Sequence, residues 1–159
     1  STARIMGMLM WIMIGAVIFS KIYIALGAGQ AIVGQIMAAE LSPYLVLSVI
    51  LLSYLVLGMF LDDSAILFIT VPLYVPIIKA LGFDPIWFAT LFVLAMQSAY
   101  LTPPFGYNLF YMRSVAPPEV TTGDLYRSVV PFLAMQVLGI VLLVLFPQIA
   151  LWLPELIFD

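Results

Sequence analysis

Two short segments of this 159-residue chain combine oxygen-bearing side chains with signals that end a helix. The first is Asp62-Asp63-Ser64, a polar turn between two apolar runs. The second is Thr-Pro-Pro-Phe-Gly at 102–106, which interrupts another apolar run. A hard cation such as Na⁺ takes several oxygen ligands, and carboxylates, hydroxyls and carbonyls at a helix break supply them. We therefore interpret both segments as candidate cation sites.

The break at 102–106 offers more than one kind of ligand. The Thr102 hydroxyl is one oxygen, and Pro103 and Pro104 leave main-chain carbonyls without N–H partners. Gly106 adds backbone flexibility. Irregular backbone at membrane depth is tolerated only where it lines a cavity or is buried in protein. The helix after each interruption also presents a positive dipole end, which suits an anionic solute, so the two elements together predict a transporter core.

Each candidate also has a structural interpretation. In the functional interpretation the hairpin tip lies inside the membrane and Ser64 caps the second arm. Asp62-Asp63 can instead be a hairpin turn that faces cytoplasmic water, and 102–106 can be a kink. Lys21 lies near the end of an apolar run and is expected to snorkel to the membrane surface. An ionisable group at membrane depth costs roughly 2.5–3.5 kcal/mol, so Asp62 and Asp63 are the charged residues most indicative of function.

Two other classes of function fit less of the pattern. A polytopic membrane enzyme could use Asp62 and Asp63 as an acid–base pair. Neighbouring residues on a helix point about 100° apart, however, and no second motif supplies a nucleophile. A channel or a purely structural membrane subunit is the remaining alternative.

Composition assigns the chain to the membrane. It has 5 basic and 8 acidic residues, 65% apolar residues and a mean hydropathy of +1.24. Soluble domains carry roughly 25% charged residues, so this chain could not cover a soluble surface. Cys and His are absent, which excludes disulfides, thiolate metal sites and a histidine base. The five basic residues form no patch that would bind nucleic acid. The nucleotide-binding loop GxxxxGK[ST] does not occur, so the energy for any uphill transport must come from an ion gradient or another subunit.

The sequence predicts an all-α integral membrane protein of five segments. Residues 1–41 hold a first transmembrane helix and a connector, and 42–82 a helical hairpin with its tip at 61–65. Residues 83–116 form a transmembrane helix broken at 102–106, because one unbroken helix over the 32 residues 85–116 would be roughly 48 Å long. Residues 117–128 form a cytoplasmic loop, and 129–159 the last transmembrane helix and a tail. The start at Ser1, without an initiator Met, predicts a piece of a longer chain.

The depth of the hairpin is left open by its length. Its arms have about 17–18 residues each, which fits two full spans or a re-entrant pair whose tip stops inside the membrane. Charge suggests an orientation, because arginines favour the cytoplasmic side. The inside would carry Arg4, Arg113 and Arg127, and the outside Glu40, Lys79, Asp84, Glu155 and Asp159, with Trp87 and Trp152 at the outer interface.

Several motifs resemble the large membrane subunit of the tripartite ATP-independent periplasmic (TRAP) transporters. They are Gly58-Met59-Phe60-Leu61-Asp62 with Pro72 and Pro76 downstream, Gly82-Phe83-Asp84-Pro85, and the run 101–110 around Thr-Pro-Pro-Phe-Gly. Val130-Pro131-Phe132 and the stretch 146–154 are similar to that family's closing helix. The resemblance runs from about residue 5 to the end and would cover only the C-terminal inverted repeat of a longer subunit.

The resemblance implies an ion-transporter-type elevator fold, with Na⁺ as the coupling ion and no other cofactor. It implies a multi-pass location in the bacterial inner membrane, in contact with lipid. The implied protein partners are a small four-helix membrane subunit, a periplasmic substrate-binding protein and the N-terminal half of the same subunit. By motif, the Na⁺ sites would involve Gly58, Asp62, Asp63, Ser64, Thr102, Pro103 and Gly106. The substrate-proximal residues would be Ser64, Gln97, Ser98, Phe105 and Asn108.

One departure bears on the solute. Many members place Asn and Gly ahead of the Thr-Pro-Pro loop, where this chain has Ala95 and Ala99. The string at 97–107 is instead similar to the branch that handles mannitol, haloaromatic or keto-acid substrates. This branch and a small organic acid as solute are expectations from the resemblance.

Overall fold

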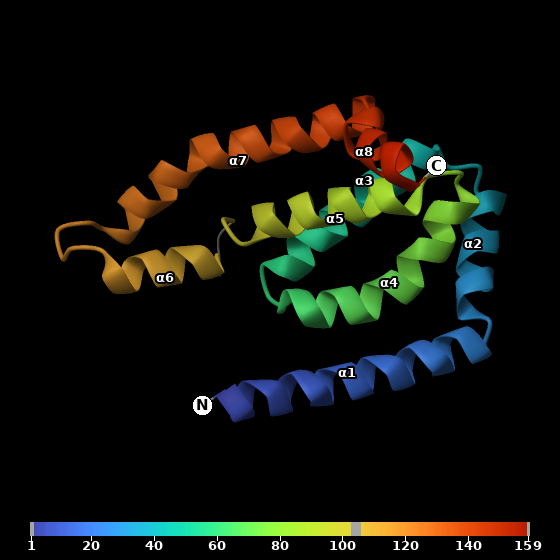
Figure 1. The fold of residues 1–159 in the computed structure, drawn as a ribbon, viewed down its shortest axis with the longest axis horizontal. Coiled ribbons are helices and arrows are strands. Elements are labelled where there is room, and N and C mark those ends of the chain that lie inside the picture. The colour runs from blue at the N-terminus through green and yellow to red at the C-terminus, as the bar shows by residue number, and fades with distance from the viewer. Residues whose placement is uncertain (1, 103–105, 159) are drawn as a thin grey trace. The chain divides into compact units, whose positions relative to one another are not determined.

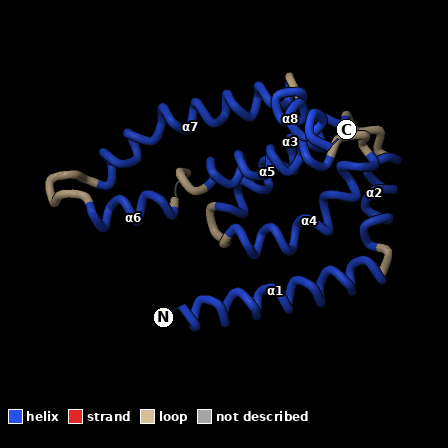
Figure 2. The backbone as a smooth tube through the Cα atoms, in the orientation of Figure 1, coloured by secondary structure: helices blue, strands red, loops and turns tan. Residues whose placement is uncertain are grey.

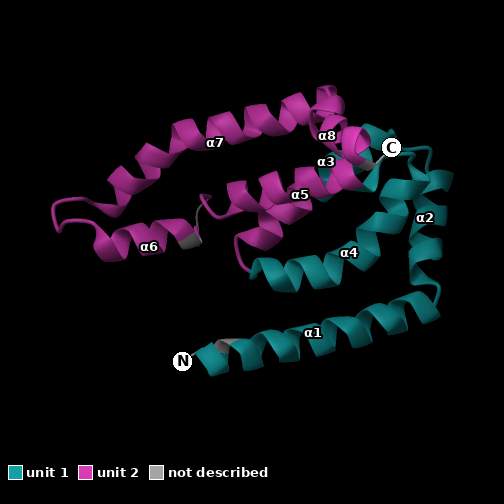
Figure 3. Cartoon of the chain, viewed as in Figure 1, with its two compact units in different colours: residues 1–50, 61–85 teal, residues 51–60, 86–159 magenta. Residues whose placement is uncertain are grey.

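The computed structural model describes residues 2–102 and 106–158, and every regular element in those ranges is an α-helix (Figures 1 and 2). Three of these helices, α1, α4 and α7, are long and apolar enough to cross a membrane. The described part of the chain is therefore an all-α membrane protein. It divides into two compact units, Ser1–Ile50 with Leu61–Pro85, and Leu51–Phe60 with Ile86–Asp159 (Figure 3).

The first unit contains α1 (Thr2–Ala25), α2 (Ala28–Ala38), the first half of α3 (Pro43–Gly58) and α4 (Asp63–Ala80). Helices α1 and α2 both pack against α4. Helix α1 ends where Gly27 adopts a left-handed backbone with φ +66°, and α2 begins in the next residue. The predicted connector thus contains an additional helix of 11 residues.

Helix α4 carries Pro72 and Pro76 in its interior. A proline lacks the N–H that would bond the carbonyl four residues earlier, so the carbonyls of Phe68 and Pro72 receive no helical hydrogen bond. The helix ends in a Schellman motif, in which Phe83 N–H donates to Ile78 (3.0 Å) and Gly82 N–H to Lys79 (3.1 Å). Gly82 has φ +81°, a conformation that glycine adopts without strain.

The second unit contains the second half of α3 with α5 (Pro85–Ala99), α6 (Tyr107–Val115), α7 (Thr122–Leu145) and α8 (Gln148–Phe158). Helix α6 packs beside α7, as Figure 1 shows, and α7 contacts α8. Trp87 on α5 is buried, and its Nε1–H donates to the carbonyl of Leu143 on α7 (2.7 Å). Trp87 thus packs inside the protein, whereas Trp152 is exposed, and their predicted position at the outer interface stays a prediction.

The C-terminal boundaries differ from the prediction. Thr121 and Asp124 form a capping box, so α7 begins at Thr122 and the predicted loop at 117–128 is shorter by half. Arg127 accordingly lies in α7 and not in a loop. The last transmembrane helix and tail predicted for 129–159 differ as well, because α7 ends at Leu145, before Pro147, and a separate helix, α8, follows.

Candidate functional site

The turn between α3 and α4 carries the paired acids at the start of a helix. Asp62 is the N-cap of α4, and its Oδ2 accepts from Ser64 N–H (3.1 Å). Asp63 Oδ1 accepts from the same N–H (2.8 Å) and from the Ser64 hydroxyl (3.5 Å). The prediction that Ser64 caps this arm is thus corrected: Asp62 is the capping residue. Two carboxylates at one helix N-terminus are electrostatically favourable.

Both acidic side chains are exposed, and Ser64 is half-buried. Each ionised carboxylate has about four lone-pair positions, and the contacts with Ser64 use only a part of them. Within the described residues, no group of three or more Asp, Glu, His or Cys side chains could hold a metal ion. A cation at this turn would therefore need hydroxyl or main-chain oxygens besides the two carboxylates.

Gly58, a predicted cation-site residue, has a packing role in the second unit. It is buried, and a Cβ built on it would lie 2.6 Å from Ala99 Cβ and 3.0 Å from Met96 Cε. Real Cβ contacts are not this short, so only glycine lets the end of α3 approach the end of α5. The close approach joins the last turn of the hairpin's first arm to the helix that leads into the predicted break.

Helix α5 ends in a turn stabilised by the predicted break residue Thr102. Its N–H donates to Ala99 (3.0 Å), and its hydroxyl donates to the carbonyl of Ser98 (2.8 Å). The donated proton leaves the lone pairs of the Thr102 oxygen available as acceptors. Pro103 and Phe105, which the sequence also predicted here, lie outside the described residues.

Gly106, directly before α6, has a left-handed backbone with φ +38° and is the N-cap residue of that helix. Gly106 is buried, and a Cβ there would lie 2.9 Å from Leu109 Cδ1. The Gly106 carbonyl accepts from the N–H groups of Leu109 (2.7 Å) and Phe110 (3.3 Å). Asn108 is exposed in the first turn of α6.

The two predicted substrate-proximal residues on α5 differ in environment. Ser98 is buried and its hydroxyl donates to Leu94 (2.9 Å). Gln97 is exposed and lines a cavity of about 430 Å³ between α5 and α7. Gln136 of α7 lines the same cavity, and its Oε1 is buried without a hydrogen-bond partner among the described residues.

Gln136 is a residue that the sequence interpretation missed. A single amide within the apolar stretch 132–145 was the available signal, because an unpaired amide at membrane depth is costly. The predicted residues are thus distributed over both units. Asp62, Asp63 and Ser64 lie in the first, and Gly58, Gln97, Ser98, Thr102, Gly106 and Asn108 in the second.

Comparison with known proteins identifies the family. Residues 1–149 match the family model described as "Tripartite ATP-independent periplasmic transporter, DctM component". The chain is 34% identical, over 99% of its length and 37% of the relative's, to the ectoine/5-hydroxyectoine TRAP transporter large permease protein UehC of Ruegeria pomeroyi. It is 33% identical to the C4-dicarboxylate TRAP transporter large permease protein DctM of Vibrio cholerae, over 94% of this chain and 33% of that protein.

The sialic acid TRAP transporter large permease protein SiaM of Vibrio cholerae is 36% identical over 72% of this chain and 26% of its own length. The chain thus spans about a third of the length of the curated relatives it matches. No solved structure matches the chain. The substrate branch expected from 97–107 stays a prediction.

The relatives are permease subunits, so the alternative of a membrane enzyme that uses Asp62 and Asp63 is wrong. The matches and the three membrane-length helices agree with a location in the bacterial inner membrane. The chain belongs to the DctM component family of the tripartite ATP-independent periplasmic transporters, as its motifs predict.

Proposed function

We propose that this chain is part of the permease of an elevator-type, Na⁺-coupled secondary transporter. The permease imports small organic acids that a periplasmic binding protein delivers. The observation that carries the proposal is the pair of carboxylates, Asp62 and Asp63, at the start of α4. They form an anionic helix end in a chain with only 8 acidic residues, and they supply the oxygen ligands that Na⁺ takes.

Helix length supports a position of this turn inside the membrane. Helix α3 has 16 residues and α5 has 15, so they are roughly 24 Å and 22 Å long. The hydrocarbon core is about 30 Å thick, and neither helix crosses it alone. Helix α4, the second arm of the hairpin, has 18 residues and is long enough to cross. The proposed depth of Asp62 and Asp63 therefore rests on the short α3, and the proposed depth of the break rests on the short α5, at a level where carboxylate and hydroxyl oxygens are kept for function.

Packing at Gly58 supports a shared function of the two interrupted elements. The end of α3 lies directly against Ala99 at the end of α5, and the Thr102 hydroxyl follows within that same turn. Movement of the α3 end is thereby passed to the residues next to the break. In this proposal the cation sites also take oxygens from residues at the break, in addition to those of Asp62, Asp63 and Ser64. These break residues are Thr102, Pro103 and Gly106.

The solute class follows from chemistry common to the relatives' names. Ectoine, C4-dicarboxylates and sialic acid all carry a carboxylate. The N-terminus of α6, a helix of 9 residues that begins at the break, presents N–H groups that suit such an anion. Ser64, Gln97, Ser98, Phe105 and Asn108 are the proposed substrate-proximal residues. The proposed protein partners are a small four-helix subunit, the binding protein and the N-terminal half of the subunit.

The test is solute uptake by proteoliposomes that contain the full-length permease, its small subunit and its binding protein. Wild-type uptake is expected to depend on an inward Na⁺ gradient. Asp62→Asn and Asp63→Asn are each expected to raise the Na⁺ concentration for half-maximal uptake at least about tenfold, the loss of one charged ligand. Glu119→Gln, which removes an exposed loop charge, is the matched control.

Unchanged Na⁺ dependence in both Asp variants would refute the cation site. Uptake that needs neither Na⁺ nor the binding protein would instead indicate the alternative, a channel. Labelling of a cysteine at position 63 measures depth independently. Reaction with a membrane-impermeant thiol reagent from the cytoplasm in every transport state would indicate an exposed turn.

A further inference from the structure

Two adjoining cavities lie in the first unit, along one side of α4. The first has a volume of about 390 Å³ and is lined by Tyr23, Ile24, Gly29, Gln30, Val33, Gly34, Pro72 and Pro76. The second has about 480 Å³ and is lined by Ala16, Val17, Ser20, Lys21, Leu67, Phe68, Val71 and Pro72. Pro72 lines both, so the two cavities adjoin at this residue, and we call them together the groove between α4 and the helices α1 and α2. Volumes in this range hold organic ligands in other proteins.

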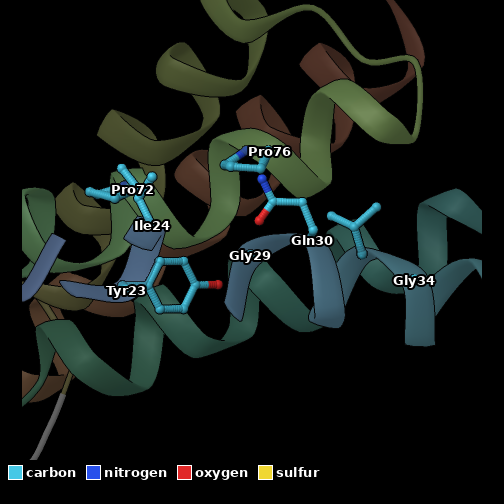
Figure 4. Close-up of a pocket in the computed structure, with 8 residues that line it drawn as sticks. Tyr23, Ile24, Gly29, Gln30, Gly34, Pro72 and Pro76 are labelled. Atoms are coloured by element: carbon cyan, nitrogen blue, oxygen red, sulfur yellow. The ribbon is translucent and has the colours of Figure 1, made fainter. Parts of the chain in front are cut away.

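The first cavity contains a buried hydroxyl that lacks a partner. Tyr23 Oη is buried and makes no hydrogen bond to any described residue. Figure 4 shows its phenol and the Gln30 amide on the same cavity. The ring lies against Gly29, where a Cβ would be in ordinary van der Waals contact with it, 3.4 Å from Tyr23 Cε1. Because buried tyrosine hydroxyls are normally hydrogen-bonded, an oxygen acceptor is expected from a molecule that enters the cavity.

The second cavity adds a positive charge to apolar walls. Lys21 and Ser20 supply its polar groups, and Leu67, Phe68 and Val71 its apolar ones. None of the described residues that line either cavity carries a carboxylate. The ammonium of Lys21 is thus complementary to an anion that also has an apolar part, because the lysine stem itself packs on apolar surface.

The positions of Lys21 and Tyr23 along α1 indicate the class of ligand that combines an anionic group with an apolar part. Lys21 and Tyr23 fall in the last turns of a membrane-length helix that ends at Ala25, so they lie within roughly 6 Å of its end. In a spanning helix this is the level of lipid phosphate and ester groups, where Lys and Tyr side chains are favoured. The groove therefore offers an ammonium group, a hydroxyl donor and apolar walls, and these groups match the phosphate, ester and acyl parts of a membrane phospholipid.

We propose that this groove binds one anionic phospholipid. Its phosphate pairs with the Lys21 ammonium, and an ester oxygen accepts from the Tyr23 hydroxyl. One acyl chain packs between Ile24, Leu67, Val71 and Pro76, which are apolar residues that line the two cavities. This lipid site is separate from the carboxylates and the helix break, and it does not depend on what the permease transports.

The test is native mass spectrometry of the full-length permease, purified and loaded with phosphatidylglycerol or with phosphatidylcholine as the zwitterionic reference. Wild type is expected to retain phosphatidylglycerol preferentially. Lys21→Gln is expected to lower this retention about fivefold, the effect of one lysine at a membrane surface. Tyr23→Phe keeps the ring and removes the hydroxyl that would donate to the ester oxygen. A similar loss of phosphatidylglycerol retention is expected.

Matched controls are Lys79→Gln and Tyr111→Phe, which change the same side chains outside the groove. Both are expected to retain the lipid as wild type does. Equal retention by Lys21→Gln, Tyr23→Phe and the two controls would overturn the proposal. Loss of retention in all four variants would also overturn it, because the binding would then be a property of the general surface.

A filled cavity provides a second measurement. Gly34 lines the first cavity, and a Cβ there would meet nothing within 4 Å, so the side chain of Gly34→Leu starts in open space and adds volume on the cavity side. We expect it to release the lipid while the melting temperature stays unchanged. A benzophenone amino acid at position 33 is expected to crosslink to phospholipid in membranes. Crosslinking to a segment of protein instead would show that a helix fills the groove and would refute the lipid site.

Discussion

The indole N–H of Trp87 donates to the carbonyl oxygen of Leu143, 2.7 Å away and 56 positions along the chain. This carbonyl would normally accept from residue 147 of a continuing helix, but Pro147 has no N–H. Trp87 therefore supplies the donor that the proline removes, and it does so in the buried interior, with 2% of its surface exposed. The contact holds the end of α7 on the start of α5.

Replacement of Trp87 by Phe should expose the importance of that donor. The ring stays apolar, but the buried Leu143 carbonyl loses its partner, which costs about 1–3 kcal/mol. A lower melting temperature of the full-length permease in detergent is the expected result. Trp152→Phe, at a residue with 62% exposure, should change it little. Equal melting temperatures of the Trp87→Phe and Trp152→Phe variants would show that the hydrogen bond to Leu143 contributes nothing to stability.

Gly58→Ala should destabilise the second unit. The new methyl group would lie 2.6 Å from Ala99 Cβ, and overpacking of this kind costs about 1–3 kcal/mol. The double variant with Ala99→Gly removes the clashing atom and should recover most of the loss in thermal stability. Gly34→Ala is the control, because its Cβ would meet nothing within 4 Å. Failure of the double variant to recover would place the cause in the backbone of α3.

Two substitutions of Asp62 should separate its role as the N-cap of α4 from the role of its negative charge. Asp62→Asn keeps an N-cap side chain for Ser64 N–H, whereas Asp62→Ala removes it at a cost of about 0.5–2 kcal/mol. We expect only the Ala variant to lose thermal stability, while both lose Na⁺-dependent uptake. Normal uptake by a fully stable Asn variant would show that Asp62 serves the helix alone.

Thr121→Ala should loosen the first turn of α7. The variant loses the bond from Asp124 N–H to Thr121 Oγ1 (3.2 Å), and such caps contribute about 0.5–2 kcal/mol. Hydrogen exchange at residues 122–126 is expected to accelerate in the full-length protein. Thr121→Ser should exchange as wild type, and Thr122→Ala, one residue outside the cap position, serves as the control. Equal exchange rates in all variants would contradict the capping role.

Local signals in the sequence located most helix starts. The predicted segment boundaries at 42 and 83 lie within two residues of the starts of α3 and α5, where Ser42 and Asp84 each precede a proline that begins the helix. The end of α7 was missed although Pro147 signals it, because the apolar run continues beyond the proline and reads as one span. The capping box at Thr121 was also present in the sequence, but the neighbouring charges favoured a loop.

Long-range packing could not be predicted in the same way. Nothing near Gly58 in the chain says that Ala99 would fill the space where a side chain would be, since the two are brought together only by the fold. The same holds for Gln136 and Gln97, which line one cavity from different helices. Residue types at the candidate site were therefore predictable, whereas their neighbours were not.

The two prolines inside α4 have a mechanical consequence for the second arm of the hairpin. Helical hydrogen bonds oppose the bending of a helix. In α4 the carbonyls of Phe68 and Pro72 lack the bond from the residue four positions later, because Pro72 and Pro76 have no N–H. Thr70 Oγ1 adds a donor to the carbonyl of Ile66 (2.7 Å), which also favours curvature. The second arm therefore lacks two helical hydrogen bonds within one short stretch, and any bend of the arm is favoured there rather than in its uninterrupted turns.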